Sequence, residues 1–182
     1  MKKKELRKIY KQKRKKLSTV EVESFQESIY QQVFEFDFLS INTIHVFLSI
    51  ERLLEINTNP IIVFLLLKNK TIVVSVSDFS SNTLTHYLFD RNTKLKESSF
   101  GIPEPINGIE IDPKEIDLVF VPLLISDKKK YRVGYGKGFY DRFLAECRTD
   151  VKTIGLNFFK PIDEIEDPNE FDIPLHQVIY PK

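Results

Sequence analysis

The segment from Arg132 to Asp141, called here the glycine segment, combines residue types that bind phosphate. Its sequence is RVGYGKGFYD, with three glycines at alternate positions, two cations and a final carboxylate. Glycine lets consecutive backbone N–H groups turn toward an anion, because no Cβ restricts the dihedral angles or blocks close approach. Arg132 and Lys137 supply positive charge, and Asp141 is placed to hold a magnesium ion. The segment therefore predicts a site for a metal-bound polyphosphate.

Neither standard nucleotide signature describes this segment. The Walker motif needs four residues between its glycines, and the dinucleotide fingerprint places its third glycine one residue later. Ordinary structural interpretations also exist. Glycines serve turns that need positive φ angles, and Asp141 is an acid of the kind favoured in the first turn of a helix.

The net charge is close to zero, but the basic residues are unevenly distributed. The chain has 27 Lys and Arg against 26 Asp and Glu, so any electrostatic partner must be attracted to a local patch. One such patch lies at the N-terminus, where ten basic residues fall within residues 2–16. Such a run is usually a solvated helix face, and a nucleic-acid-binding module is the alternative function that it suggests.

Cysteine content and hydropathy indicate the compartment. Cys147 is the single cysteine, so no internal disulfide can form, and we expect it to be a small buried hydrophobic residue. The basic N-terminus leads into no signal-peptide core, and the longest apolar run, Ile61 to Leu67, is far below the ~18 residues of a membrane span. We expect a soluble cytoplasmic protein with no membrane contact.

Local patterns predict several helices and strands. Residues 2–16 lack Gly and Pro and are rich in helix formers, and Ser18 with Glu21 forms a capping box that opens a second helix. Further strands are expected at residues 43–48, 71–76, 83–89, 117–121 and 153–156, and further helices from Asn59-Pro60 and over residues 139–147. Residues 100–105 are predicted to be irregular, because each proline removes a donor and restricts the residue before it.

The alternation of strands and helices predicts the fold class. The stretch 117–121 is almost entirely apolar, as expected for a strand buried on both faces of a parallel sheet. We therefore predict an α/β fold, a three-layer sandwich with a mostly parallel central sheet flanked by helices. The 182 residues fit one domain spanning 1–182, with ligands near the carboxyl ends of the strands.

Four separated segments together resemble the 5-formyltetrahydrofolate cyclo-ligase family, also called methenyltetrahydrofolate synthetases. They are KKELR at residues 3–7, FLSIE with EINT within residues 47–58, GIPEP at residues 101–105, and the glycine segment with the following RFL at residues 142–144. Their order and spacing extend the resemblance from one end of the chain to the other.

The resemblance implies an enzyme that uses ATP and magnesium to convert 5-formyltetrahydrofolate into 5,10-methenyltetrahydrofolate, with release of ADP and phosphate. In the family the formyl oxygen is thought to attack the γ-phosphate, after which the N10 amine closes the ring and phosphate leaves. Phosphoryl transfer asks a protein mainly for positioning and charge neutralisation. The implied partners are these small molecules, without nucleic acid, and the implied assembly is a monomer or homodimer.

The resemblance also implies roles for individual residues. The residues implied for ATP are Lys3, Lys4, Arg7, Arg132, Gly134, Tyr135, Gly136, Lys137, Gly138, Phe139 and Tyr140. The residues implied for folate are Ile50, Glu55, Tyr135, Gly136, Lys137, Gly138 and Phe139. Arg132 and Lys137 are the expected catalytic cations, and Asp141 and Asp172 the expected metal ligands. Without the resemblance, Glu55 is a surface residue before a turn; with it, Glu55 is an acceptor for pterin N–H groups.

Two positions depart from the family pattern. Ser75-Val76 lies where many relatives carry Pro and a basic residue, and His176 lies where relatives often have Asp. The first departure suggests a further alternative, a relative that binds folate or nucleotide without turnover. His45 and His86 fall on predicted strands, where structural histidines are common, and no histidine is assigned to catalysis.

Overall fold

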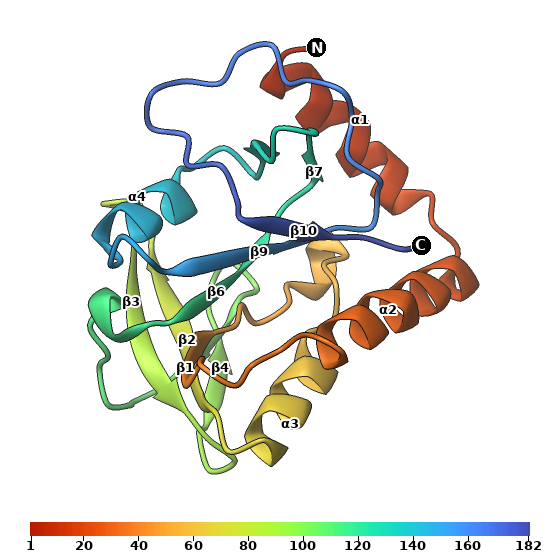
Figure 1. Cartoon of the computed structure of the whole chain (residues 1–182). Helices are drawn as coiled ribbons and strands as arrows, with labels where there is room; N and C mark the ends of the chain where they lie inside the picture. Colours follow the sequence, from red (N-terminus) through yellow and green to blue (C-terminus); the bar gives the residue numbers. More distant parts are fainter.

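A central sheet of six strands organises the fold (Figure 1), and the computed structural model describes residues 1–182. The strands follow the spatial order β10-β9-β6-β1-β2-β3. Neighbouring strands are parallel except for β2 and β3, which pair antiparallel. The bounds are Thr43–His45 for β1, Thr71–Asp78 for β2, Thr83–Phe89 for β3, Leu118–Pro122 for β6, Lys152–Leu156 for β9 and Gln177–Ile179 for β10. The predicted mostly parallel sheet is confirmed.

Helices cover both faces of this sheet, which makes the three-layer sandwich that the sequence predicts (Figure 1). α2 (Thr19–Phe34) and α3 (Asn59–Leu67) lie on one face, and α4 (Phe139–Glu146) lies on the other. Side chains along β6 alternate between the faces: Phe120 packs with α2 and α3, whereas Val119 packs with the apolar side of α4. Burial of both faces explains why this strand is so apolar.

The N-terminal helix α1 (Lys3–Lys15) lies outside the sandwich. It packs against a small antiparallel ladder of β7 (Ile125–Ser126) and β8 (Arg132–Val133). Leu6 and Tyr10 of α1 belong to a third apolar cluster that includes residues of this ladder. Because β8 begins the glycine segment, this packing brings the basic N-terminal helix to the predicted phosphate site.

The predicted capping box at the start of α2 is confirmed. The Ser18 hydroxyl accepts a hydrogen bond from the Glu21 N–H at 3.3 Å, and the Glu21 carboxylate accepts one from the Ser18 N–H at 2.8 Å. This reciprocal pair satisfies two N–H groups that have no partner inside the helix. Across the whole molecule, no helix combines the length and the apolar character that crossing a membrane requires.

The prediction that residues 100–105 are irregular is wrong at Pro103–Pro105. These residues form strand β5, which pairs antiparallel with β4 (Leu95–Glu97). An edge strand uses the donors of only one side, so prolines are tolerated there. The ladder is extended at its ends by the N–H groups of Ser98 and Ile106, which donate to Ile102 and Lys94 carbonyls at 2.9 and 3.0 Å.

Candidate functional site

The glycine segment connects β8 to α4 through a tight turn. Gly136 and Gly138 have φ angles of 93° and 74°, a left-handed backbone that a residue with a Cβ adopts only with strain. A Cβ on Gly134 would have no neighbour within 4 Å. The need for a turn therefore explains two of the three glycines, and the backbone at Gly134 borders open space.

Arg7 of α1 lies directly against this turn. Its Nε donates a hydrogen bond to the Gly134 carbonyl oxygen at 2.9 Å. A Cβ built on Gly136 would lie 2.9 Å from the Arg7 guanidinium carbon, so this glycine is also required for close approach. The structure therefore brings together Arg7 and the glycine segment, although 127 positions separate Arg7 from Gly134 in the chain.

Arg132 and Asp141 form an ion pair across the turn. The Arg132 Nη2 and the Asp141 Oδ1 are 2.6 Å apart, and the side chain of Arg132 is only 7% exposed. The Nη1 of Arg132 donates to the Ile173 carbonyl oxygen. Burial lowers the pKa of Arg132, whereas the negative charges of Asp141 and Asp172 raise it. Both predicted metal ligands therefore act on the same guanidinium.

Asp172 is paired with another predicted ATP residue. Its carboxylate forms an ion pair with the Lys3 ammonium, and both side chains are largely buried. The same carboxylate oxygen accepts a hydrogen bond from the Asn169 N–H at 2.6 Å. Each predicted metal ligand is thus neutralised by a cation that the sequence assigns to ATP.

The chemistry of these carboxylates fits magnesium. Mg²⁺ prefers oxygen ligands and is commonly held by one or two carboxylates together with substrate phosphates. Asp141 and Asp172 both lie close enough to Arg132 to change its pKa. The structure contains no cluster of three or more His, Cys, Asp or Glu side chains that would hold a metal by itself. The donor set therefore suits an ion whose coordination is completed by phosphate oxygens.

Two further predicted ATP residues point into solvent. Lys4 and Lys137 are exposed, and neither side chain forms an ion pair with the protein. The carbonyl oxygen of Lys137 accepts a hydrogen bond from Arg142 at 2.9 Å, which fixes the backbone but leaves the ammonium group free.

Glu55 is held inside a tight turn and is more than a surface residue. It follows a short 3-10 helix, η1 (Glu51–Leu53), and the left-handed residue Leu54 with φ 50°. Its Oε2 accepts a hydrogen bond from the Ile50 N–H at 2.9 Å. Burial raises the pKa of Glu55, and the Ile50 hydrogen bond opposes this shift. Ile50 therefore contributes its backbone N–H to the same turn.

Tyr135 joins Glu55 to the glycine segment. Its hydroxyl interacts with the Glu55 carboxyl and so lowers the pKa of Glu55, against the larger effect of burial. The same hydroxyl accepts a hydrogen bond from Nη1 of Arg14 at 3.0 Å. Sequence reasoning assigned no role to Arg14. A signal existed, because Arg14 follows Leu6 and Tyr10 at a spacing of four and so shares the buried face of α1.

The first two residues of α4, Phe139 and Tyr140, have different surroundings in the site. Burial and the charge of Glu55 raise the pKa of Tyr140, whereas the charge of Arg132 lowers it, so Tyr140 lies within range of both sides of the site. Phe139 contacts Phe79 edge to face, with ring centroids 5.2 Å apart, and Phe79 in turn stacks on Phe100 at 4.0 Å. Phe79 and Phe100 come from two separate loops, and no local sequence pattern indicates that they meet Phe139.

A model of the 5-formyltetrahydrofolate cyclo-ligase family matches residues 1–181 of the chain. The chain belongs to this cyclo-ligase family. The cyclo-ligase of Haemophilus influenzae is 34% identical over 131 residues, which cover 69% of each chain, and that of Mycoplasma pneumoniae is 27% identical over 98% of each chain.

Solved structures of the cyclo-ligase family have the same fold. A 5,10-methenyltetrahydrofolate synthetase from Mycoplasma pneumoniae superposes with a TM-score of 0.77 at 27% identity and covers 100% of both chains. The synthetase from Aquifex aeolicus has a TM-score of 0.82 at 26% identity, covering 98% of this chain and 89% of its own. The predicted family and enzyme class are confirmed.

At two positions that depart from the cyclo-ligase pattern, Ser75 and His176, the side chains form hydrogen bonds inside the protein. The Ser75 hydroxyl lies 2.8 Å from His45 Nε2 and 2.8 Å from His86 Nδ1, and both histidines are buried. His176 Nδ1 lies 2.9 Å from the Thr153 hydroxyl.

Cys147 is half-buried, so the expectation of a buried residue is only partly met. Burial raises the pKa of its thiol to about 12.

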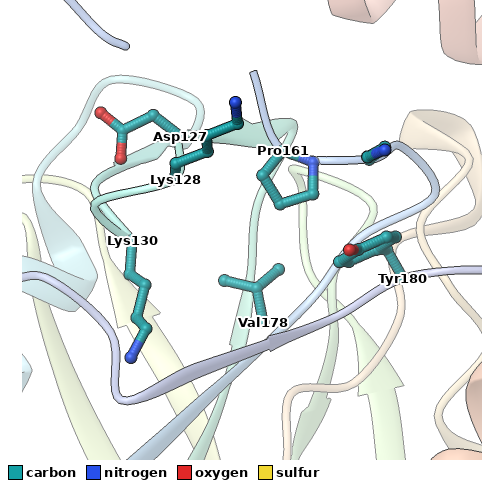
Figure 2. A pocket seen from close by; sticks show the side chains of 7 residues that line it. Asp127, Lys128, Lys130, Pro161, Val178 and Tyr180 are labelled. Carbon is teal, nitrogen blue, oxygen red and sulfur yellow. The ribbon is translucent and has the colours of Figure 1, made fainter. Parts of the chain in front are cut away.

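A cavity of about 270 Å³ is lined by none of the residues that the cyclo-ligase resemblance implies, and Figure 2 shows the side chains that line it. Its lining residues are Asp127, Lys128, Lys130, Lys160, Pro161, Val178 and Tyr180. Asp127 has a structural role, because its carboxylate accepts hydrogen bonds from the N–H groups of Tyr131 and Ile165 at 3.0 Å each. The cavity therefore adds no residue to the candidate site.

Proposed function

We propose that this protein converts 5-formyltetrahydrofolate into 5,10-methenyltetrahydrofolate with hydrolysis of ATP to ADP and phosphate, and that the reaction requires magnesium. One observation carries the proposal beyond family membership. Tyr135 lies within the glycine segment, and its hydroxyl and the Glu55 carboxyl shift each other's pKa, which supports a site in which the segment that suits a triphosphate also forms a wall of the folate site. A γ-phosphate bound there lies next to the folate.

The phosphate side supplies charge and backbone donors. Arg7, which contacts the glycine segment from α1, neutralises the triphosphate together with Arg132 and Lys137 of the segment itself. Lys3 and Lys4 extend the positive charge along α1. Asp141 and Asp172 would hold the magnesium ion, which neutralises phosphate charge when bound. For Arg132 and Lys3 to reach phosphate, their ion pairs with the two carboxylates must open.

The folate side supplies an acceptor and aromatic faces. The carboxylate of Glu55 accepts pterin N–H groups, and these donors offset the cost of burying its charge. Tyr135, between the first two glycines, and Phe139, directly after the third, offer rings on which a flat ligand stacks. Ile50 contributes through its N–H, which orients Glu55.

The chemistry then needs no nucleophile from the protein. The formyl oxygen forms a bond to the γ-phosphorus while the bond to the ADP oxygen breaks. The N10 amine next attacks the activated carbon and loses its proton, and inorganic phosphate leaves with the former formyl oxygen. Arg132 and Lys137 stabilise the charge on the transferred group, which is the main requirement of phosphoryl transfer.

An absorbance assay tests this proposal. Protein, Mg-ATP and 5-formyltetrahydrofolate are mixed, and the near-UV absorbance of the methenyl product is followed. We expect a rise that requires ATP and stops when EDTA removes magnesium. A folded protein that binds both substrates without any rise would be the non-catalytic relative, and one that binds nucleic acid but neither substrate would be a nucleic-acid module.

A further inference from the structure

Arg14 is a buried cation with no ion-pair partner. It lies in the last turn of α1 and is 4% exposed, and no carboxylate lies within ion-pair distance of its guanidinium. A buried charge without a paired counter-charge is costly unless other groups solvate it. Its neighbours in sequence, such as Lys15, are exposed, so burial of Arg14 needs an explanation of its own.

One contact of Arg14 reaches the folate side of the site, and the others lie in the protein interior. Nη1 donates to the Tyr135 hydroxyl at 3.0 Å, and Nη2 donates to the Leu123 carbonyl oxygen at 2.7 Å. The guanidinium also lies 5.6 Å from the ring centroid of Phe158. Its Nε is buried and has no hydrogen-bond partner. The Leu123 carbonyl anchors one end of the fork, so the other end fixes the position of Tyr135.

We propose that Arg14 is a positioning residue for folate, which fixes the side chain of Tyr135 in the folate site and places a positive charge on the side of Glu55. This inference rests on the proposed function. It adds a residue that does not contact the reacting atoms but fixes Tyr135, which the proposed function places against the substrate. A lysine has a single point charge and no planar fork, so it does not replace both hydrogen bonds.

The charge environment of Glu55 supports this role. Burial raises the pKa of Glu55, while the Ile50 N–H, the positive charge of Arg14, the Tyr135 hydroxyl and the charge of Arg52 lower it. Burial and, to a smaller extent, the charge of the same carboxyl raise the pKa of Tyr140. Arg14 therefore favours the ionised carboxylate, which accepts hydrogen bonds from two N–H groups at once.

The spacing of Arg7 and Arg14 along α1 separates the positioning of Tyr135 from ATP binding. Arg7 and Arg14 are two helical turns apart, about 10 Å along the helix axis, and both contact the glycine segment. Arg7 contacts the Gly134 carbonyl, and Arg14 contacts the Tyr135 side chain. Loss of Arg14 should therefore weaken folate binding while leaving ATP binding almost unchanged.

The test compares Arg14→Met with Arg14→Lys, and uses Lys15→Met as an exposed control on the same helix. We expect Arg14→Met to weaken binding of 5-formyltetrahydrofolate, measured by calorimetry without ATP, by about 10- to 100-fold. The KM for ATP should change less than about threefold. In Arg14→Met, the acid limb of the pH profile of kcat/KM for folate should move to higher pH, because Glu55 loses a cation that lowers its pKa. In Arg14→Lys, which keeps the positive charge, the acid limb should move less.

A merely structural role predicts equal losses for both substrates and no shift of the acid limb, and that result would overturn the inference. If Arg14→Met fails to fold, a double-mutant cycle of Arg14→Lys with Tyr135→Phe decides the question. Non-additive losses in folate affinity support the inference, and additive losses contradict it. Failure of the proposed function looks different, because the unmodified protein itself would then not bind or convert 5-formyltetrahydrofolate.

Discussion

On the phosphate side of the candidate site, charges cancel in pairs: Lys3 with Asp172, and Arg132 with Asp141. On the folate side, Arg14 and Tyr135 are instead joined through a hydrogen bond, and Glu55 lies beside them without an ion pair. Under the proposed function, ion pairs of the first kind would exchange partners when a polyanion and a metal bind, so we expect these side chains to rearrange. The folate side needs no such exchange, and we expect it to keep its geometry on binding.

Arg132→Met should cause the largest change, because Arg132 is buried and lies beside both carboxylates that we propose as metal ligands. We expect kcat/KM to fall by about 10³-fold, as for other cations that stabilise a transferring phosphoryl group. The free energy of unfolding should fall by about 3 kcal/mol, because Asp141 loses its partner. Steady-state kinetics and urea unfolding measure the two effects. Activity close to that of the unmodified protein would remove Arg132 from the phosphate site.

Lys137→Ala should lose activity without losing stability, because its ammonium group is exposed and forms no ion pair in the protein. Loss of one charge-assisted contact, worth about 1.5 to 3 kcal/mol, should lower kcat/KM by roughly 10- to 150-fold. The Tm should stay the same. A normal rate would show that Lys137 points away from the phosphates, and Lys4→Ala provides a second exposed lysine for comparison.

Glu55→Gln tests the folate side in the same way. Loss of the carboxylate should raise the KM for folate by about 10- to 100-fold and leave the KM for ATP unchanged. Unlike Arg132→Met, which should lower the stability of the fold, Glu55→Gln should raise it. Because burial raises the folded-state pKa of Glu55, the ionised group lowers stability at pH values above the unfolded pKa. The Tm of Glu55→Gln at pH 7 to 8 should therefore exceed that of the unmodified protein, and a lower Tm would contradict this account.

Asp141→Asn should act through the metal. We expect the magnesium concentration for half-maximal activity to rise several-fold, because a neutral amide is a weaker ligand for a hard cation. Equilibrium binding of magnesium in the presence of a non-hydrolysable ATP analogue provides a readout apart from turnover. An unchanged magnesium titration would refute a role for Asp141 as a ligand.

The smallest effect concerns the buried histidines beneath α4. Burial lowers the pKa of His86 to about 4, against about 6.5 in an unfolded chain. The unfolded state therefore binds more protons between these values, so the free energy of unfolding should fall as the pH drops from about 6.5 to 4. His86→Gln should flatten this dependence in urea unfolding experiments. An identical pH dependence in both proteins would show that His86 does not titrate in this range.

The parts of the fold that depend on local patterns are the parts that sequence predicts well. The Ser18 capping box and the apolar strand at residues 117–121 depend on neighbours or on simple burial, and both are present. Strand β5 was missed because its pairing with β4 is a tertiary contact that the prolines conceal. The predicted strand at 43–48 ends early, at His45, because the chain then turns toward η1.

The candidate site shows the same division. The glycine segment is contiguous, so its composition alone indicates a phosphate-binding turn. Arg14 meets Tyr135 only because α1 packs against β7 and β8, and no local pattern gives that contact. The ion pairs of Asp141 and Asp172 likewise depend on the folded positions of Lys3 and Arg132, so the pairs that a metal would have to displace under the proposed function could not be predicted from sequence.

The most direct test is a crystal structure with magnesium, a non-hydrolysable ATP analogue and 5-formyltetrahydrofolate. We expect the triphosphate to lie along the glycine segment, with its terminal phosphate beside the formyl oxygen. The Arg132–Asp141 and Lys3–Asp172 pairs should be open, while Arg14, Tyr135 and Glu55 keep their present contacts. A triphosphate bound elsewhere, with both ion pairs intact, would contradict the account.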